Sequence, residues 1–223
     1  MHQRKSKIIL IYCFLLIFSS SISNNSFKIL ELIKIQNIKI SGLDQKENQI
    51  ILNKLKHLKL ENIFYINKHE IEKLLNSNSL IESYKVIKKY PSTINIDIKK
   101  TSFLAKVNNN GKIFLIGSNG KLTLEEKSNN DLPFIFGKPN IVDFLKLKKI
   151  LEKSKFSYNQ IESFYFYPSK RWDLKLKKNI MLKLPVNFTN ELLDNLYKFI
   201  EKYNLKNSTI IDARIKNQII LNE

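Results

Sequence analysis

The chain has 223 residues, which is enough for two small domains, and 43% of them are hydrophobic, which excludes a disordered tail. Its net charge of +18 would suit a nucleic-acid or anionic-lipid partner. The lysines, however, fall on every predicted element instead of clustering on one, and alanine occurs only at positions 105 and 213, a composition typical of AT-rich coding. The charge by itself therefore does not indicate a nucleic-acid surface.

The sequence contains no recognisable catalytic or metal-binding motif. A single cysteine, Cys13, excludes an intramolecular disulfide, and the three histidines are too far apart for metal-ligand spacing. The G-x-S-x-G, P-loop, H-E-x-x-H and C-x-x-C motifs are absent. We therefore expect a protein that is not an enzyme and that uses no cofactor, no metal and no small-molecule substrate.

The amino terminus has the layout of an export signal. Three basic residues among the first seven precede an unbroken apolar run at 8–18, and serines follow it. A retained signal anchor and a cleaved signal peptide both fit this pattern. As a helix, residues 8–22 span about 22 Å, short of a hydrocarbon core of about 30 Å, and length does not decide between the two. Either interpretation places residues 24–223 outside the cytoplasm.

Residues 35–101 are expected to form a small α+β domain in the order strand, helix, helix, strand, strand. A partial alternation before a turn glycine predicts the first strand, and apolar residues on one helical face predict a helix over 46–58. Asn67 fits an N-cap with Glu70 as its capping-box partner, which predicts a second helix after an apolar connector.

The closing hairpin of this domain carries its clearest pattern. Ile94, Ile96 and Ile98 alternate with polar residues, which is the period of a half-buried strand. Tyr90 and Pro91 precede this run. Because proline fixes φ and lacks an N–H, this position is predicted to lie in a turn between two strands.

Residues 102–223 are expected to form a second domain that is rich in strands. Runs with period-2 alternation or many aromatic residues, bounded by turn residues, predict strands at 103–107, 112–116, 121–124, 161–167, 172–177 and 180–184. The apolar segment 132–137 is bounded by breakers and is not assigned to a strand. Asn140 and Thr189 fit the N-caps of two helices. Residues 209–221 predict a final strand pair or one long bulged strand.

Three features of the second domain invite a chemical interpretation. Asp173 lies between lysines on a predicted strand, so a surface ion pair is expected rather than a general base. Asp212 and Arg214 lie two residues apart, on the same side of one strand, which favours a structural ion pair over a catalytic role. Trp172 is expected to belong to the core or to a half-buried platform.

Several of these motifs resemble, in order, those of the FtsQ/DivIB family of bacterial cell-division proteins. In the first domain they are I-x-I-x-G at 38–42, I-F-Y-I-N at 63–67, and V-x-x-x-Y-P-x-T-I-x-I-x-I, which contains Tyr90 and Pro91. The resemblance covers roughly residues 35–221.

The second domain carries the more specific part of this resemblance. Its L-P-x-x-x-G at 132–137 matches the family, as does the R-W-x-L-x-L run that begins with Arg171 and Trp172. The terminal I-D-x-R, with Asp212 and Arg214, matches as well. The chain departs from the family at Asn179, where many members have glycine.

The resemblance implies an α+β fold and a definite order of segments and domains along the chain. A cytoplasmic tail at 1–7, a transmembrane signal anchor at 8–23 and a linker at 24–34 would precede a POTRA domain at 35–101 with the order β-α-α-β-β. An FtsQ-type β domain at 102–223, mixed or antiparallel with two helices, would follow. The apolar side chains of the anchor would include Ile8, Leu10, Phe14, Leu16 and Phe18.

The resemblance also implies a function, that of a non-catalytic divisome scaffold. Such a protein crosses the inner membrane once, with its amino terminus in the cytoplasm and its domains in the periplasm, and gathers at the division site. It would contact other division proteins through the POTRA domain and would hold the FtsB–FtsL complex through its last strand. Carried over to this sequence, that strand comprises Ile215, Lys216, Asn217, Gln218, Ile219, Ile220 and Leu221.

Two other functions fit parts of the sequence. A different POTRA-containing envelope assembly or secretion factor would share the first domain. A basic nucleic-acid-binding protein would share the net charge, but the export signal weighs against it.

Overall fold

The computed structural model describes residues 9–19, 33–125, 131–205 and 209–222. A helix covers residues 9–19. No helix in these ranges is both long and apolar enough to cross a bilayer, so the transmembrane helix expected over 8–23 is not found. Ile8, residues 20–23, the expected tail at 1–7 and most of the expected linker lie outside the described residues. The chain divides into two compact units between Lys100 and Thr101.

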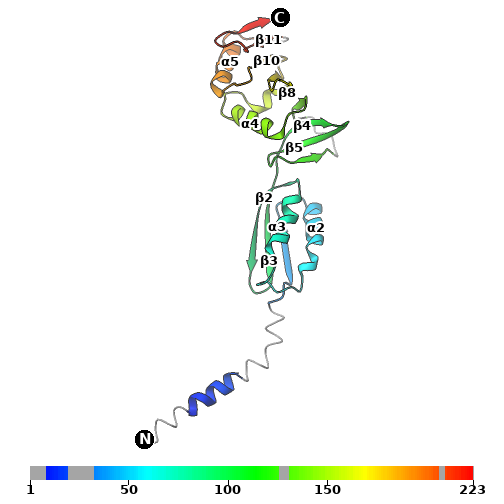
Figure 1. The fold of residues 1–223 in the computed structure, drawn as a ribbon, viewed down its shortest axis with the longest axis vertical. Coiled ribbons are helices and arrows are strands. Elements are labelled where there is room, and N and C mark those ends of the chain that lie inside the picture. Colours follow the sequence, from blue (N-terminus) through cyan, green and yellow to red (C-terminus); the bar gives the residue numbers. More distant parts are fainter. Residues whose placement is uncertain (1–8, 20–32, 126–130, 206–208, 223) are drawn as a thin grey trace, which may run out of the picture. The chain divides into compact units, whose positions relative to one another are not determined.

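The first unit has the predicted order of strand, helix, helix, strand and strand (Figure 1). Its elements are β1 (Asn37–Ser41), α2 (Gln45–Lys54), the 3-10 helix η1 (Lys56–Leu58), α3 (Lys68–Ser77), β2 (Ile81–Lys89) and β3 (Thr93–Lys100). The strands form one sheet in the order β1-β3-β2, with β1 parallel and β2 antiparallel to the central β3. The helix expected over 46–58 ends at Lys54, and the chain continues as the tighter 3-10 turn.

Local sequence signals explain most of this unit. Ile94, Ile96 and Ile98 are buried as the alternation predicts, and they pack in the core that the helices cover. Asn67 caps α3, because its side chain accepts a hydrogen bond from the backbone N–H of His69. The capping box is wrong, however, since the carboxylate of Glu70 lies 2.8 Å from Nε2 of His57 instead.

The second unit is built on a nine-stranded mixed sheet with helices α4 and α5. Its strands are β4 (Phe103–Asn109), β5 (Lys112–Gly117), β6 (Leu122–Leu124), β7 (Phe134–Phe136), β8 (Ile161–Phe166), β9 (Trp172–Leu176), β10 (Met181–Lys183), β11 (Ile210–Asp212) and β12 (Ile220–Asn222). The helices are α4 (Ile141–Glu152), the 3-10 helix η2 (Tyr158–Gln160) and α5 (Asn190–Lys202). The sheet order is β12-β11-β10-β9-β8-β7-β4-β5-β6.

The predicted caps and turns of this unit are confirmed. Asn140 accepts from the N–H of Val142, and Thr189 accepts from the N–H of Leu192. Asn179 adopts φ of 58° in the turn between β9 and β10, a conformation that asparagine tolerates well. The segment 132–137, which no pattern assigned, contains β7, which joins β4 and β8 by parallel pairing on both sides.

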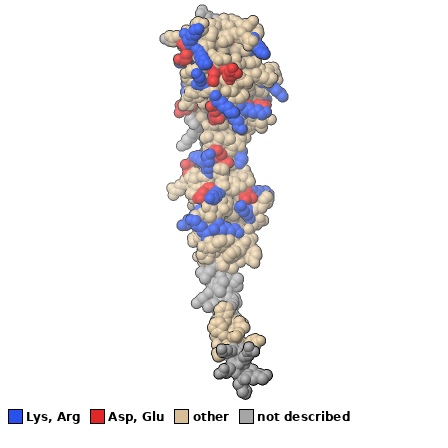
Figure 2. All heavy atoms as spheres, turned by 90° about the vertical axis from the view of Figure 1, so that its left-hand side faces the viewer, with Lys and Arg blue, Asp and Glu red and all other residues tan. Residues whose placement is uncertain are grey.

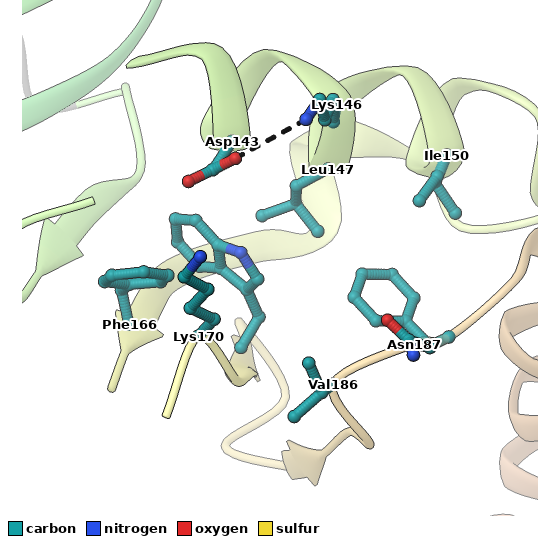
Figure 3. Close-up of a pocket in the computed structure, with 10 residues that line it drawn as sticks. Asp143, Lys146, Leu147, Ile150, Phe166, Lys170, Val186 and Asn187 are labelled. Atoms are coloured by element: carbon teal, nitrogen blue, oxygen red, sulfur yellow. Dashed lines mark ion pairs between the residues drawn. The ribbon is translucent and has the colours of Figure 1, made fainter. Parts of the chain in front are cut away.

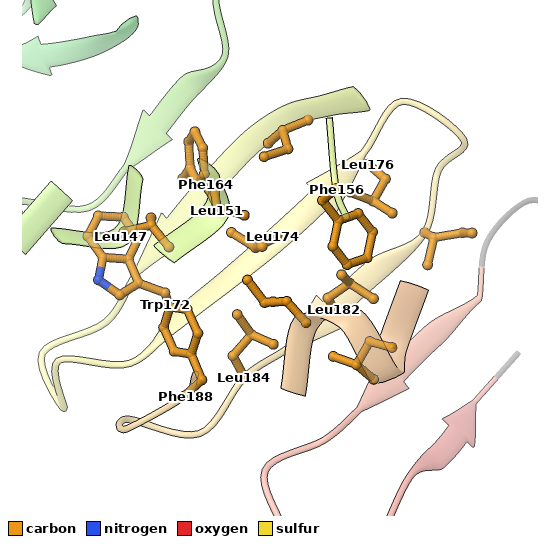
Figure 4. Close-up of a cluster of buried hydrophobic side chains, with 14 of the residues drawn as sticks. Leu147, Leu151, Phe156, Phe164, Trp172, Leu174, Leu176, Leu182, Leu184 and Phe188 are labelled. Carbon is orange, nitrogen blue, oxygen red and sulfur yellow. The ribbon is translucent and has the colours of Figure 1, made fainter. Parts of the chain in front are cut away.

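One hydrophobic core holds the sheet and the helices of the second unit together. Phe164, Leu174, Leu182 and Ile211 lie side by side on neighbouring strands, all fully buried. Figure 4 shows Phe164, Leu174 and Leu182 of this row among side chains from α4 and from the segment before α5. Because strand residues alternate between faces, the residues next to this row belong to the opposite face of the sheet.

Candidate partner-binding site

The final strand, β12, lies at one end of the nine-stranded sheet and pairs antiparallel with β11. The strand expected over 215–221 is shorter than predicted, since only Ile220 and Leu221 of that set lie in β12. Residues 215–219 instead form the reversal that precedes it. There Asn217 has φ of 62°, and the N–H of Gln218 donates to the carbonyl of Ile215 at 3.2 Å. A left-handed residue cannot continue a strand, which explains the difference.

The exposed edge of β12 is apolar and uncharged. Ile220 and Leu221 are 42% and 44% exposed, and the preceding Ile219 is 37% exposed. Residues 217–222 contain amides and aliphatic side chains but no charge. Natural edge strands are usually protected by charged residues, proline or a bulge, because their free backbone groups recruit other strands. β12 is a short strand of three residues, and it carries neither a charged residue nor a proline at this edge.

The hydrogen bonds of the inner strands fix which backbone groups face that edge. The N–H of Met181 donates to the carbonyl of Thr209, and the N–H of Ala213 donates to the carbonyl of Lys183. Thr209 and Ala213 flank β11 on either side, so backbone groups at odd-numbered positions of this segment point toward β10. Ile210 and Asp212 must then face β12, where they oppose Asn222 and Ile220. Since backbone direction alternates along a strand, the N–H and C=O of Leu221 point to the outer edge.

A row of charged side chains crosses the sheet beside this edge. Asp173, Lys183 and Asp212 lie opposite one another on β9, β10 and β11, and Ile220 is next in the row. The alternating signs allow three charges to share one face of the sheet, since opposite charges on adjacent strands attract.

Asp212 and Arg214 form an ion pair at the start of the β11–β12 connection. Nε of Arg214 lies 2.8 Å from Oδ1 and 2.9 Å from Oδ2 of Asp212, and the backbone N–H of Arg214 also donates to Oδ1. The hydrogen bond from Arg214 holds the pKa of Asp212 below its ordinary value, although burial of the carboxylate opposes this. The pair links two residues at the point where the chain leaves β11 and enters the last hairpin.

The interpretation of Asp173 as half of a surface pair requires correction. Its side chain is 1% exposed, although it does form an ion pair, with Nε of Arg171 lying 3.1 Å from Oδ1. The guanidinium of Arg171 also lies over the ring of Tyr167, 4.2 Å from its centroid. The flanking lysines suggested solvent, but the central position of β9 in the sheet decides burial.

Trp172 belongs to the core, at 4% exposure, and also lines a hollow of about 340 Å³. Figure 3 shows Asp143, Lys146 and Leu147 of α4 on one side of this hollow and Val186 with Asn187 on the other. Asp143 and Lys146 pair with each other at 3.7 Å. Within the described ranges, no group of three His, Cys, Asp or Glu side chains could hold a metal ion.

Tyr90 and Pro91 lie far from the last strand in sequence, in the turn between β2 and β3 of the first unit. The ring of Tyr90 stacks on that of Phe64, with 4.9 Å between the centroids. A second aromatic pair was missed from the sequence: Phe136 of β7 stacks on Tyr165 of β8 at 4.8 Å, in the same row as Asp173. Both segments are rich in aromatic residues, which was the available signal, but the pairing of these residues depends on the sheet order.

These observations define the class of protein. A three-stranded sheet with two helices, followed by a separate mixed β-sheet domain, is the architecture of a POTRA domain with a β domain after it. Residues 33–100 match the model of the FtsQ-type POTRA domain, and residues 99–214 match that of the FtsQ/DivIB carboxyl-terminal domain. The chain belongs to the FtsQ/DivIB family of cell-division proteins.

Two FtsQ proteins from Rickettsia agree with this assignment. Cell division protein FtsQ of Rickettsia bellii is 32% identical over 193 residues, which is 83% of this chain and 70% of that protein. FtsQ of Rickettsia felis is 30% identical over the same shares of the two chains. The solved extracytoplasmic domain of DivIB from Geobacillus stearothermophilus is 15% identical, with a TM-score of 0.32 over 48% of this chain and 98% of that one.

Proposed function

We propose that this protein is a non-catalytic scaffold of the division machinery and that it binds its partner by strand addition at β12. The observation that carries the proposal is the exposed, uncharged strand at the edge of the large sheet. An added strand gains main-chain hydrogen bonds from the edge and side-chain contacts from alternate residues. The family resemblance indicates that the partner is the FtsB–FtsL pair, with FtsB supplying the strand.

The two faces of β12 would give this binding its specificity. Leu221 lies opposite Ile211 and extends the apolar row of the core face, whereas Ile220 follows Asp212 on the charged face. A partner strand beside β12 would therefore meet an apolar row on one side and the carboxylate–guanidinium pair of Asp212 and Arg214 on the other. We expect its side chains to alternate between apolar and polar in the same register.

The remaining parts of the proposal concern location and further partners. Every large apolar side chain described on the helix at 9–19 is more than half exposed, among them Leu10, Phe14, Leu16 and Phe18. A membrane would cover these apolar side chains, so we place residues 8–23 in the inner membrane, as the family resemblance implies, with both units on the periplasmic side. The first unit would contact other division proteins.

The spread of charge favours this function over nucleic-acid binding. Lysine and arginine side chains lie over both units in the face drawn in Figure 2, and acidic side chains are interspersed among them. Nucleic-acid binding requires a localised basic surface. Membership in a cell-division family likewise favours a division role over other POTRA-containing envelope factors.

A matched pair of proline substitutions tests strand addition. Leu221→Pro removes an N–H that faces the outer edge, so we expect partner capture to fall at least about tenfold while the unit stays folded, the loss expected for one or two main-chain hydrogen bonds. Ile220→Pro removes an N–H that faces β11, so we expect it also to loosen the hairpin itself.

The measurement is capture of a purified FtsB–FtsL complex, together with thermal unfolding of each variant. Normal capture by a folded Leu221→Pro variant would show that the partner does not add a strand here. A Leu221→Ala variant keeps the N–H and serves as the control for loss of the side chain.

A further inference from the structure

Four exposed apolar side chains gather at one end of the first unit. Leu60, Phe64, Tyr65 and Tyr90, which we call the tip, are 74%, 55%, 86% and 59% exposed. Within the described residues 33–100, Ile50 is the only other exposed large hydrophobic residue. Scattered exposed residues are ordinary, but a cluster of this kind marks an interaction surface.

A ring contact and two hydrogen bonds fix the position of Phe64 in the tip. Phe64 stacks on Tyr90, and the N–H of Phe64 donates to the side chain of Asn62 at 2.9 Å. Nζ of Lys88 reaches the carbonyl of Phe64 at 3.4 Å. These contacts join the connector before α3 to the turn between β2 and β3.

Leu60 has a backbone conformation that is unfavourable for a residue with a side chain. Its φ is 78°, in the left-handed region, where a residue with a Cβ is disfavoured by about 1 kcal/mol relative to glycine. The side chain gains little in return from packing, because it is 74% exposed, more than any other leucine in the described part of this unit. A strained apolar residue that faces solvent indicates a function for the exposed side chain.

Lysines surround the tip. Lys59 precedes Leu60, and Lys89 precedes Tyr90. The backbone of Lys34 pairs with that of Asn62 in an isolated antiparallel β-bridge. All three lysines are exposed, and Glu61 is the acidic residue within the same connector. In the face drawn in Figure 2, the lower end of this unit is uncharged and a row of blue side chains runs directly above it. Aromatic and aliphatic residues with a lysine rim are the composition of a surface that meets lipid headgroups.

The tip lies at the end of the unit where the chain enters from the apolar segment. The N–H of Ile63 donates to the carbonyl of Ile33, and the N–H of Leu60 donates to that of Ile35, so the tip lies where the chain enters the unit. Residues 19 and 33 are at most about 50 Å apart, because an extended chain advances about 3.5 Å per residue. A bilayer that holds residues 9–19 is therefore within reach of the tip.

We propose that the tip docks on the anionic headgroup surface of a phospholipid bilayer. This inference rests on the proposed membrane placement of the amino terminus but does not involve β12. Tyr65 and Leu60 enter the interface, and the lysines contact the phosphates. Docking would orient the first unit against the membrane that anchors it.

A pair of probes at opposite ends of the unit tests the proposal in the full chain. In a Cys13→Ser background, Gln36→Cys places a thiol-reactive fluorophore beside the tip, and Gln45→Cys places it at the start of α2 at the other end of β1; both glutamines are exposed. The protein is reconstituted in phosphatidylcholine–phosphatidylglycerol vesicles that contain shallow brominated lipids. We expect stronger quenching at position 36 than at position 45, and equal quenching would overturn the proposal.

Charge variants test the lipid class. Each lysine near an anionic surface contributes about fivefold to the docking equilibrium. Lys59→Gln with Lys89→Gln should therefore lower docking roughly 25-fold, whereas Lys46→Gln with Lys85→Gln, which removes the same charge away from the tip, should change it little. Vesicles of phosphatidylcholine alone should weaken docking as the first pair does. Equal effects of the two pairs would contradict a specific role for the tip.

A third variant separates docking from folding. Leu60→Gly suits the positive φ, so we expect unfolding at the same or a higher temperature together with reduced quenching at position 36. Unchanged quenching, with a loss of protein-partner capture instead, would assign the tip to a protein and overturn the lipid proposal. A separate sample, the wild-type chain labelled at Cys13, tests whether the amino-terminal helix enters the bilayer. An unquenched fluorophore there would show that it does not. Failure of strand addition would be seen in the Leu221→Pro capture.

Discussion

Phe144 of α4 provides the sharpest test of how the second unit is stabilised. Its side chain is fully buried, and its ring centroid lies 5.6 Å from that of Phe164 and 6.4 Å from that of Trp172. Truncation of such a phenylalanine costs about 3–5 kcal/mol, because both the apolar contacts and the edge-on ring contacts are lost. A unit of this size has a stability of about 5–15 kcal/mol, so Phe144→Ala should remove a large part of it.

Trp172 makes this prediction simple to measure. It is the only tryptophan of the chain, so its fluorescence in a urea titration reports the unfolding of the second unit. With a urea dependence of about 2 kcal/mol per molar, Phe144→Ala should lower the midpoint by roughly 2 M. Val142→Ala, on the exposed face of the same helix, should change it by less than about 0.5 M. Equal shifts for the two variants would refute the assignment of Phe144 to the core.

Two further predictions concern backbone strain and pH. A Cβ at Gly137, where φ is +96°, would lie 2.2 Å from the carbonyl oxygen of Phe166, whereas a Cβ at Gly111, where φ is +80°, would meet open space. Gly137→Ala should therefore unfold at a clearly lower temperature than Gly111→Ala, and similar melting curves for the two variants would contradict this. Because Arg214 lowers the pKa of Asp212 in the folded state, the stability that this carboxylate contributes is present above its unfolded pKa of about 3.9 and is lost as pH falls through the folded pKa. The stability difference between the wild type and Asp212→Asn should therefore shrink below about pH 4, and a constant difference would show that the pair does not couple to folding.

Local signals in the sequence predicted much of the fold. The isoleucines at 94, 96 and 98 identified β3 and its buried face. The N-caps at Asn67, Asn140 and Thr189 placed the starts of three helices. These signals succeed because a cap or an alternating strand depends on residues a few positions apart.

The candidate sites were less predictable because they depend on pairing between distant residues. The sequence placed the final strand near the carboxyl end, but Asn217 turns the chain and leaves β12 with only three residues. Asp173 is buried because β9 lies between β8 and β10 in a wide sheet, although the charged residues Arg171 and Lys175, two positions away on either side, suggested a solvent-facing position. No period in the sequence indicates which strand lies beside which.

The sequence by itself therefore determined the type of each main element, the two-part organisation and the family, because these follow from spacing, caps, turns and motifs along the chain. Only the tertiary structure decided that segment 132–137 contains a strand between β4 and β8, that β12 ends the sheet, and that Leu60, Phe64, Tyr65 and Tyr90 lie at the same end of the first unit. The physical reason is that sheet order and burial are set by contacts between residues far apart in sequence, where local preferences carry no information.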